Sequence, residues 1–537
     1  MPKPYVVIAV LAAAIAPLTA LAQAGANPFA QAGENGDAAR EGFVRCDRFV
    51  EGWLMNTDFE TGLIPRNLTN GRDIWNAQDS AADNYPFMVL TAAVIDREMF
   101  EGTMYDMLKT ERRLTSRIGS LPDTWSFSKD GFLDPEPDLG RIIFGASEYA
   151  KDGLLPLTEL LGKTPWTQRM IEMLNDMWAR APIETTFGAI VSENHEINGE
   201  MLQTLSRVYW MTGDARYLEW AVRLGDYYLL GDHHPTRDSD RLRLRDHGCE
   251  IVSGLCELYA TVNYALPSKK TAYEKPLHEM LDRILDVGRN TDGLFYNVIN
   301  PQTGAQIPES GSGIADTWGY TLNGYYTVYL IDQTKRYREA VLTVLNILNN
   351  RDRSFDWENE SADSYADAIE SALNLYNREP VPSAADWIDR EIRVMWSKQR
   401  EDGIVEGWHG DGNFARTTIM YCLWKTCGLT AEPWRENVRF GAVAQNDSLY
   451  IAFKSEHPWD GMLVFDIRRH AYHMNLPFDW PRINQFPEWF TVEPDESYEI
   501  INQMNGRKET MSGRDLRSGL HIEASADSEL RLIVTRK

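Results

Sequence analysis

The sequence predicts a mainly α-helical protein in which helical hairpins stand side by side and a small antiparallel β domain follows them. Three observations predict this fold. A short phrase recurs in which a helix ends in aromatic residues, turns at a polar stretch and restarts on an aromatic residue. The pattern from residue 40 to about residue 430 is that of amphipathic helices. After Trp434, β-type runs separated by turn residues replace it.

The recurring phrase is clearest at Val208–Leu218 and is repeated at Val328–Tyr337, with a looser copy at Leu160–Trp166. Each copy is typical of the bend of an antiparallel helical hairpin. The copies lie roughly 50 and then over 100 residues apart, which is an irregular period for a repeat protein. The longer gap, between Leu218 and Val328, therefore predicts a further hairpin that the phrase does not mark.

The helical segments follow one another with short connections. They are Arg40–Met55, Asn84–Asp96, Thr167–Ala179, Gly199–Thr212, Ala215–Leu230, Gly248–Ala265, Tyr273–Val287, Trp318–Asp332, Tyr337–Asn349, Ser364–Asn377, Ala384–Gln399 and Thr417–Thr426. This number of helices is enough for six or seven hairpins. Because the hairpins of a closed ring share one interior, such a ring explains how 40–430 can form a single domain.

The connections contain a second phrase, a Gly-containing turn followed by alternating apolar residues. It occurs at Thr61–Pro65, Asp292–Tyr296 and Asp402–Glu406. Turns of this kind lead into short strands, which at one end of a helical ring would build a rim around a cavity. Plain surface loops are the alternative interpretation.

Residues 435–537 are predicted to form a β-sandwich-like domain. Strands are expected at Arg439–Ala444, Ser448–Phe453, Gly461–Asp466 and Leu530–Val534. An aromatic cluster comprising Phe478, Trp480, Pro481, Trp489 and Phe490 lies between the third and the fourth of these strands. It forms either the core of this domain, which the pattern favours, or a closure over the helical domain.

The N-terminus is typical of a secretory signal peptide. Lys3 precedes an apolar run from Tyr5 to Leu21, and small residues follow as cleavage sites near residue 24. We therefore expect residues 1–24 to be removed, 25–39 to be a linker and the protein to be secreted or periplasmic. An uncleaved anchor is the alternative, and no other segment is long and apolar enough to span a membrane.

Charge and cysteine content exclude several classes of function. A net charge of -25 argues against a nucleic-acid partner. Five cysteines do not make a disulfide scaffold in a chain of 537 residues, and Cys249 and Cys256 are expected to be buried thiols. No P-loop, dinucleotide fingerprint, zinc motif or serine nucleophile elbow is present, so we expect neither a cofactor nor a bound metal.

The hairpin turn Thr212–Leu218 and the segment Asp316–Tyr320, set among helical hairpins with Gly-rich links, resemble the six-hairpin glycosidase superfamily. The resemblance covers about residues 40–430. It implies an (α/α)6-7 toroid and a carbohydrate substrate. Members are secreted glycoside hydrolases, and some polysaccharide lyases are built on related toroids.

Breaking a glycosidic bond needs one protonated and one ionised carboxyl group. The first candidate cluster precedes the helix at Pro86 and contains Asp79 and Asp83, one helical turn apart, with Trp75 as a sugar-stacking ring. Helix capping is the alternative role for these acids.

Two further clusters combine acids with histidine at helix starts. Asn194, His195 and Glu196 form one of them. Asp246, His247 and Glu250 form the other. Imidazole changes charge near neutral pH, so both clusters are candidate catalytic groups.

The remaining clusters mix aromatic and polar residues in a way that suits sugar subsites. Asp316 is a candidate acid beside Trp318 and Tyr320. Trp408, His409 and Arg416 follow glycines, and Arg416 is expected to hold a uronate carboxylate. By contrast, the acids Asp363, Asp367 and Glu370 are expected to form a solvated helix face or cap.

Three functions remain in competition. The first is a glycoside hydrolase whose acid and base are among Asp79, Glu196, Asp246, Glu250 and Asp316. The second is a polysaccharide lyase in which His195 or His247 removes a proton beside a uronate carboxylate that Asn194 or Arg416 neutralises. The third is a non-catalytic glycan-binding toroid. In each case the clusters should lie at one mouth of the ring, opposite the hairpin turns.

Overall fold

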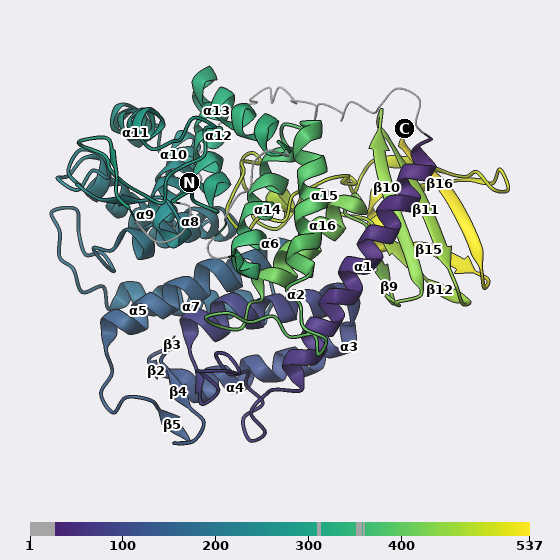
Figure 1. Cartoon of the computed structure of the whole chain (residues 1–537), viewed down its shortest axis with the longest axis horizontal. Helices are drawn as coiled ribbons and strands as arrows, with labels where there is room; N and C mark the ends of the chain where they lie inside the picture. Colours follow the sequence, from purple (N-terminus) through teal and green to yellow (C-terminus); the bar gives the residue numbers. More distant parts are fainter. Residues whose placement is uncertain (1–26, 309–312, 351–356, 358–359) are drawn as a thin grey trace, which may run out of the picture.

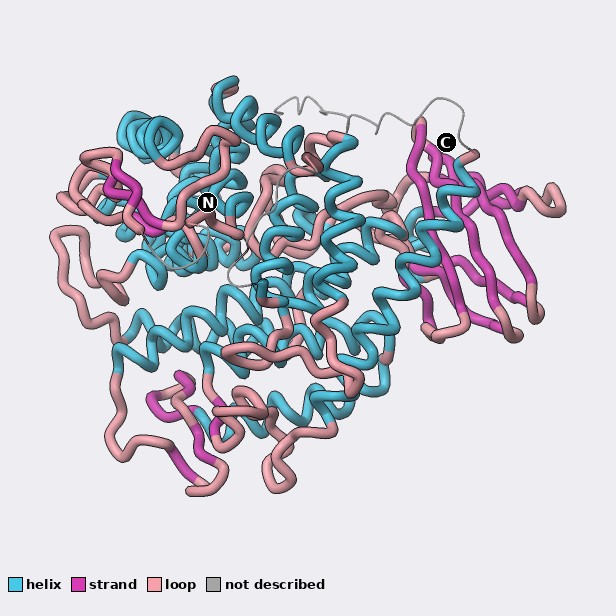
Figure 2. Tube along the Cα trace, in the orientation of Figure 1, coloured by secondary structure: helices cyan, strands magenta, loops and turns pink. Residues whose placement is uncertain are grey.

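A computed structural model describes residues 27–308, 313–350, 357 and 360–537 of the chain. The signal peptide predicted at residues 1–24 lies outside these residues. Figure 1 shows a large helical part and, beside it, a smaller part built of strands from the C-terminal quarter of the chain. In Figure 2 the strands of this smaller part stand together at one side of the molecule.

The helical part is a closed ring of hairpins. Its inner helices are α2 (Tyr85–Ile95), α5 (Leu139–Glu148), which runs through the π-helical turn η3 (Tyr149–Leu154) into α6 (Leu155–Leu161), α8 (His195–Thr212), α10 (Glu250–Ala265), α12 (Trp318–Asp332), α14 (Ala362–Tyr376) and α16 (Asn413–Lys425). Each packs on the next, and α16 packs on α2. In the described part of the chain this makes a ring of seven hairpins, within the predicted six or seven.

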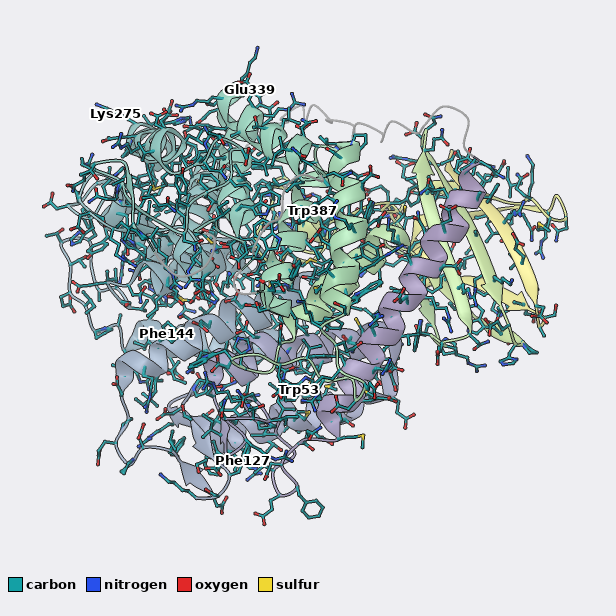
Figure 3. All side chains as sticks on the ribbon, viewed as in Figure 1. Trp53, Phe127, Phe144, Lys275, Glu339 and Trp387 are labelled. Atoms are coloured by element: carbon teal, nitrogen blue, oxygen red, sulfur yellow. The ribbon has the colours of Figure 1, made fainter. Side chains whose placement is uncertain are left out.

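The outer helices cover the ring and alternate with the inner ones along the chain. They are α1 (Pro28–Leu54), α4 (Tyr105–Thr115), α7 (Pro165–Ala179), α9 (Ala215–Leu229), α11 (Pro267–Val287), α13 (Lys335–Ile347) and α15 (Pro382–Trp396). Short helices α3 (Arg97–Met99) and η2 (Phe100–Met104) lead into α4. Inner helices are buried on nearly all sides, whereas outer helices are amphipathic. Figure 3 shows side chains filling the helical part, with Lys275 and Glu339 at its outer surface.

The predicted helices are confirmed to within a few residues at most ends. The hidden hairpin is α10–α11, whose turn at Leu266 has neither glycine nor a polar stretch. The sequence did not predict α4 or the α5–η3–α6 helix. Lys151 and Asp152 interrupt the apolar pattern of that helix, yet both are buried.

The N-terminal linker predicted at 25–39 is wrong from Pro28 onward. The Asn27 side chain caps α1 by accepting from the Phe29 amide, and the small residues of this stretch allow close packing instead of flexibility. A Cβ atom on Gly36 would lie only 3.0 Å from the backbone nitrogen of Gly441 in the β domain. Small size is therefore needed where α1 crosses the sheet, as Figure 1 shows.

Short sheets occupy the connections, though not where the second phrase predicts them. One sheet has the order β1 (Ile74–Trp75), β4 (Trp125–Ser126) and β5 (Gly131–Phe132). A second pairs β2 (Ser116–Ile118) with β3 (Leu121–Pro122). A third has the order β6 (Leu242–Arg243), β7 (Val298–Asn300) and β8 (Ala305–Gln306). Thr61–Pro65 contains no strand, and Asp292–Tyr296 and Asp402–Glu406 contribute isolated bridges.

The C-terminal part contains the predicted antiparallel strands in two sheets. One has the order β10 (Val438–Gln445), β11 (Ser448–Ser455), β16 (Ser528–Arg536), β13 (Ser497–Asn502) and β14 (Lys508–Ser512). The other has the order β15 (Leu520–Ala524), β12 (Trp459–Val464) and β9 (Thr430–Glu432). The short helices α17 (Arg469–Tyr472) and α18 (Gly513–Ser518) connect strands.

Residues 473–490, here called the inserted segment, leave the sheets and pass among the C-terminal ends of the inner helices (Figure 1, yellow-green chain beside α14). Trp480 is fully buried there, and its Nε1 donates to Glu257 of α10 at 3.1 Å. Phe478 packs on Tyr264, with ring centroids 5.6 Å apart. The favoured assignment of these aromatics to the β-domain core is therefore wrong, because they close over the helical ring.

The five cysteines are buried free thiols, as expected for Cys249 and Cys256. Within the described residues, no helix combines the length and the hydrophobicity that a bilayer crossing requires.

Candidate functional site

The acidic and histidine clusters lie at the N-terminal ends of the inner helices. The hairpin turns, such as Gly213 after α8 and Gln333 after α12, lie at the C-terminal ends of the same helices. Since the inner helices stand side by side, their first turns gather at one end of the ring. The sequence clusters therefore share the end opposite the hairpin turns.

His247 is the centre of the first group of charges. It lies in the short helix η4 (Asp246–Cys249), which leads into α10. Its Nδ1 is 3.7 Å from a carboxylate oxygen of Asp152 and 3.7 Å from one of Glu200, and its Nε2 is 3.5 Å from Asp246. Burial alone would lower the pKa of His247, but Asp246, Glu148 and Asp152 raise it well above the usual value. His247 is therefore an imidazolium at neutral pH.

Asp246 is a partly exposed carboxylate of this group, with a side chain 36% exposed. Burial raises its pKa, but His247, Arg243 and Arg245 together hold it below the usual value. Its backbone adopts a left-handed φ of 51°, a conformation that few residues other than glycine, asparagine and aspartate adopt. Asp246 is thus an ionised, solvent-reachable carboxylate.

Asp152 is buried behind His247 and is also ionised. The Lys151 ammonium donates to it at 2.6 Å and also to Glu250. Burial raises the pKa of Asp152, but Lys151 and His247 lower it below the usual value. Glu250 also accepts from Gln203 of α8, and burial raises its pKa despite Lys151.

Glu148 and Glu200 are buried carboxyls whose pKa is shifted in the opposite direction to that of Asp152. Burial, reinforced by neighbouring acids, raises the pKa of both well above the usual value. Neither oxygen of Glu200 has a hydrogen-bond partner among the described residues. Burial therefore favours the protonated form of both side chains, while the charge of His247 opposes it.

A second group of charges surrounds His409, which precedes α16. Its Nε2 lies 3.6 Å from Oδ2 of Asp83, at the end of the π-helical turn η1 (Ala77–Asn84). Burial raises the pKa of Asp83 to about 7 and that of Asp411 to about 7. The acids around His409, Asp83 first, overcome burial and raise its pKa to about 9. Asp79 in the same turn is paired with Arg66 at 2.6 Å.

Arg416 is paired with two acids of α14. Its guanidinium lies 2.7 Å from Asp367 and 2.9 Å from Glu370 of α14, so its charge is already matched inside the protein. The Tyr320 hydroxyl donates to the same two acids, at 2.8 and 3.0 Å. The charge of Arg416 is thus matched without a uronate, and Asp367 and Glu370 pair with it instead of forming the predicted solvated face.

The three tryptophans predicted to stack on a sugar divide into one exposed ring and two buried ones. Trp408 is 78% exposed, adjoins His409 and is covered on one face by the Arg66 guanidinium, 4.7 Å from the ring centroid. Trp75 in β1 is 2% exposed and Trp318 in α12 is fully buried. Trp408 is therefore open to solvent, whereas burial leaves no free face of Trp75 or Trp318 for the subsite role expected of them.

His195 and Asn194 lie apart from the His247 group. Asn194 caps α8, accepting from the Glu196 amide at 2.8 Å, while Glu196 itself faces His247. His195 lines a surface pocket of about 520 Å³ together with Glu193, Tyr227, Tyr228, Asp232, His233, Asp238, Ser239, Asp240 and Gln302. Burial and His233 lower the pKa of His195.

Asp316 is buried before α12 and accepts from the Thr317 amide.

A cation could share some of these side chains. One potential ligand atom from each of Glu148, Glu196, Glu200 and His247 lies within 4.8 Å of the others. The His247 imidazolium already supplies positive charge there, so a metal would have to displace its proton.

Sequence reasoning missed Glu148, Lys151 and Asp152 as site residues. A signal was present, because Glu148, Lys151 and Asp152 occur at helical spacing inside an otherwise apolar run. Charged residues in such a run are buried only when other elements supply partners. Those partners come from α8, η4, α10 and the inserted segment, and the sequence does not reveal that they meet.

The sequence matches no protein-family model and no curated protein. Several solved structures are similar to this chain at low identity. A variant α-1,6-mannanase from Salegentibacter in complex with α-1,6-mannotetrose is 9% identical, with 71% of this chain and 97% of that chain covered and a TM-score of 0.40. A possible glycoside hydrolase of family 105 from Salmonella enterica is 13% identical (52% and 81% covered, TM-score 0.37). A cellobiose 2-epimerase from Bacillus thermoamylovorans is 11% identical (58% and 86% covered, TM-score 0.38). At these identities no residue role passes to this chain.

Proposed function

We propose that the protein hydrolyses glycosidic bonds at the N-terminal ends of its inner helices. Hydrolysis requires a carboxylic acid that protonates the leaving oxygen and a carboxylate that acts as base or nucleophile. Burial gives Asp83 a pKa of about 7, whereas His247 and Arg243 keep Asp246 ionised. The pKa values of a buried carboxyl, Asp83, and a 36% exposed one, Asp246, are shifted in opposite directions although both feel the charge of His247, and this difference carries the proposal.

The charges around this site favour a neutral sugar over a uronate. Arg66 is paired with Asp79, Lys151 with Asp152, and Arg416 with Asp367. A uronate carboxylate would therefore enter an acidic environment in which these cations are already matched. The exposed ring of Trp408, next to His409, offers a face on which a neutral pyranose can stack.

Elimination is less well supported by the same geometry. His247 holds a proton at neutral pH, so it is a poor base. His195 has a lowered pKa, but its pocket is lined by Glu193, Asp232, Asp238 and Asp240, which would repel a uronate. Export, predicted from residues 1–24, belongs to the same proposal, because it would bring the enzyme to glycans outside the cytoplasm.

The test uses a panel of neutral and uronate-containing oligosaccharides. Reducing ends should appear with a neutral member and without the ultraviolet absorbance of an unsaturated uronate product. Asp83→Asn and Asp246→Asn should each lower kcat about 10²–10⁴-fold. The control Asp495→Asn changes a carboxylate of the β domain that is 91% exposed and should leave kcat unchanged. Reducing ends that form equally fast in both site variants would contradict the assignment.

A further inference from the structure

The inserted segment enters the helical ring from the end that carries the hairpin turns, and buried charges anchor it there. Arg482 is fully buried and donates to Glu159 of α6 at 3.0 Å and to Asp479 at 2.9 Å. The guanidinium of Arg207 in α8 donates to the Ile483 carbonyl at 3.3 Å. These contacts fix the segment along the inside of the ring.

Asn484 is the residue of this segment that reaches the candidate site. It is 1% exposed, and its Nδ2 donates to Oδ1 of Asp152 at 2.8 Å. Its Oδ1 accepts from Arg416 at 3.1 Å, and its backbone amide donates to Glu370 at 2.6 Å. The backbone has a φ of 60°, in the left-handed region that asparagine and glycine tolerate best.

The contact with Asn484 orients Asp152 toward His247. Oδ1 of Asp152 is held by Asn484 and by Lys151 of the neighbouring position. Its other oxygen has no hydrogen-bond partner among the described residues and lies 3.7 Å from Nδ1 of His247. An Asp152 side chain released from Asn484 could turn away and leave the imidazole without this neighbour.

We propose that Asn484, supplied by the C-terminal part of the chain, is a positioning residue of the candidate site. Through Asp152 it holds the His247 imidazole beside Asp246. The part of this inference that concerns catalysis rests on the hydrolysis proposed for Asp246. The part that concerns the Asp152–His247 pair does not, and it can be measured without substrate.

Two variants separate the contribution of the Asn484 side chain from that of its backbone. Asn484→Gly keeps the left-handed backbone and the amide that donates to Glu370 but removes the side-chain donor. Asn484→Asp keeps an oxygen for Arg416 but sets a second carboxylate against Asp152. Asn475→Gly is the matched control, because Asn475 lies in the same segment, has a φ of 55° and donates to Met211, away from Asp152.

The first measurement follows the His247 ring by nitrogen-15 NMR as a function of pH. The groups facing His247 are Asp246 of its own turn, Asp83 of η1, Glu148 and Asp152 of the α5–η3–α6 helix, Glu196 and Glu200 of α8, and Glu250 of α10. In Asn484→Gly the His247 midpoint should move toward lower pH, because its carboxylate neighbour is no longer held. In Asn475→Gly it should not move. An unchanged midpoint and unchanged shifts in Asn484→Gly would overturn the positioning role, whatever the enzyme does.

The second measurement is the pH profile of kcat and KM on the neutral oligosaccharide that the parent cleaves. Asn484→Gly should lower kcat about ten- to a hundredfold with little change in KM, the effect of losing one hydrogen bond to a charged group. Asn484→Asp should in addition shift one limb of the pH profile of kcat along the pH axis. If the His247 midpoint moves but the parent cleaves no glycan, the positioning role stands and the proposed hydrolysis fails. A moved midpoint with unchanged kcat would overturn the catalytic part of the inference.

Discussion

Nε2 of His409 lies 3.6 Å from Oδ2 of Asp83, in a setting where burial pushes the pKa of the carboxyl up to about 7. The imidazolium limits this rise, because its positive charge favours the ionised carboxylate. The acids around His409 in turn raise the pKa of that imidazole to about 9. The two side chains therefore tune each other across the pH range in which a proton donor must act.

The pH dependence of kcat/KM follows from this pair. Asp83 must be protonated to act as the acid, so activity should fall as the pH rises through about 7. His409→Gln removes the charge that lowers the Asp83 pKa, so the alkaline limb should move to higher pH. The measurement is the kcat/KM profile of both proteins. A limb that stays in place in the variant would show that Asp83 is not the group that titrates.

The effect of burial on the pKa of Asp411 can be measured through the pH dependence of folding stability. Burial raises its pKa in the folded protein to about 7, whereas in the unfolded chain the value is near 3.8. The unfolded chain therefore gives up this proton first, so folding stability is lost as the pH rises from about 4 to about 7. Asp411→Asn should be about 1–3 kcal/mol more stable than the parent near pH 8 and equal to it near pH 4. Urea unfolding at the two pH values measures the difference, and a gain of equal size at both would contradict this origin.

The sequence predicted more of the fold than of the site, for a physical reason. Helix 318–332 was predicted to the residue, because its apolar periodicity and flanking turns are local signals. Asp367 and Glu370 were assigned to solvent because Arg416, which pairs with them, lies on another helix. Asn484 gave no sign that it meets Asp152, because 332 positions separate them in the chain. Local pattern determines helices, whereas the pairing of buried charges depends on how the ring closes.

The crossing of α8 and α10 predicts where a single methyl group is not tolerated. A Cβ atom on Gly199 would lie 2.3 Å from the backbone carbon of Glu250. Gly199→Ala should therefore lower the free energy of unfolding by about 1–3 kcal/mol and shift the start of α10. Gly33→Ala is the control: this helical glycine has no atom within 4 Å of the added Cβ, and the change should stabilise the protein by about 0.5–1 kcal/mol. Equal effects in the two variants would contradict the close packing.

Trp408 should contribute to substrate binding and not to folding. Its ring is 78% exposed, and removing it leaves no cavity in the core. Trp408→Ala should raise KM about five- to tenfold, the loss of one aromatic stacking contact, with kcat and the unfolding midpoint nearly unchanged. Trp318→Ala, which empties a fully buried site, should instead destabilise the protein by about 3–5 kcal/mol. A KM unaffected by Trp408→Ala would place the sugar elsewhere.

The pair of Arg482 and Glu159 joins the β domain to the helical ring and should make the two unfold together. Arg482→Met leaves Glu159 buried without this partner, so it should lower the free energy of unfolding by about 3–5 kcal/mol. Arg482→Met combined with Glu159→Leu replaces both charges by apolar groups and should recover much of that loss. Calorimetry should show one transition for the parent, since the segment that carries Arg482 crosses both parts. Two separate transitions in the parent, or a double variant as unstable as the single one, would show that this buried pair does not couple them.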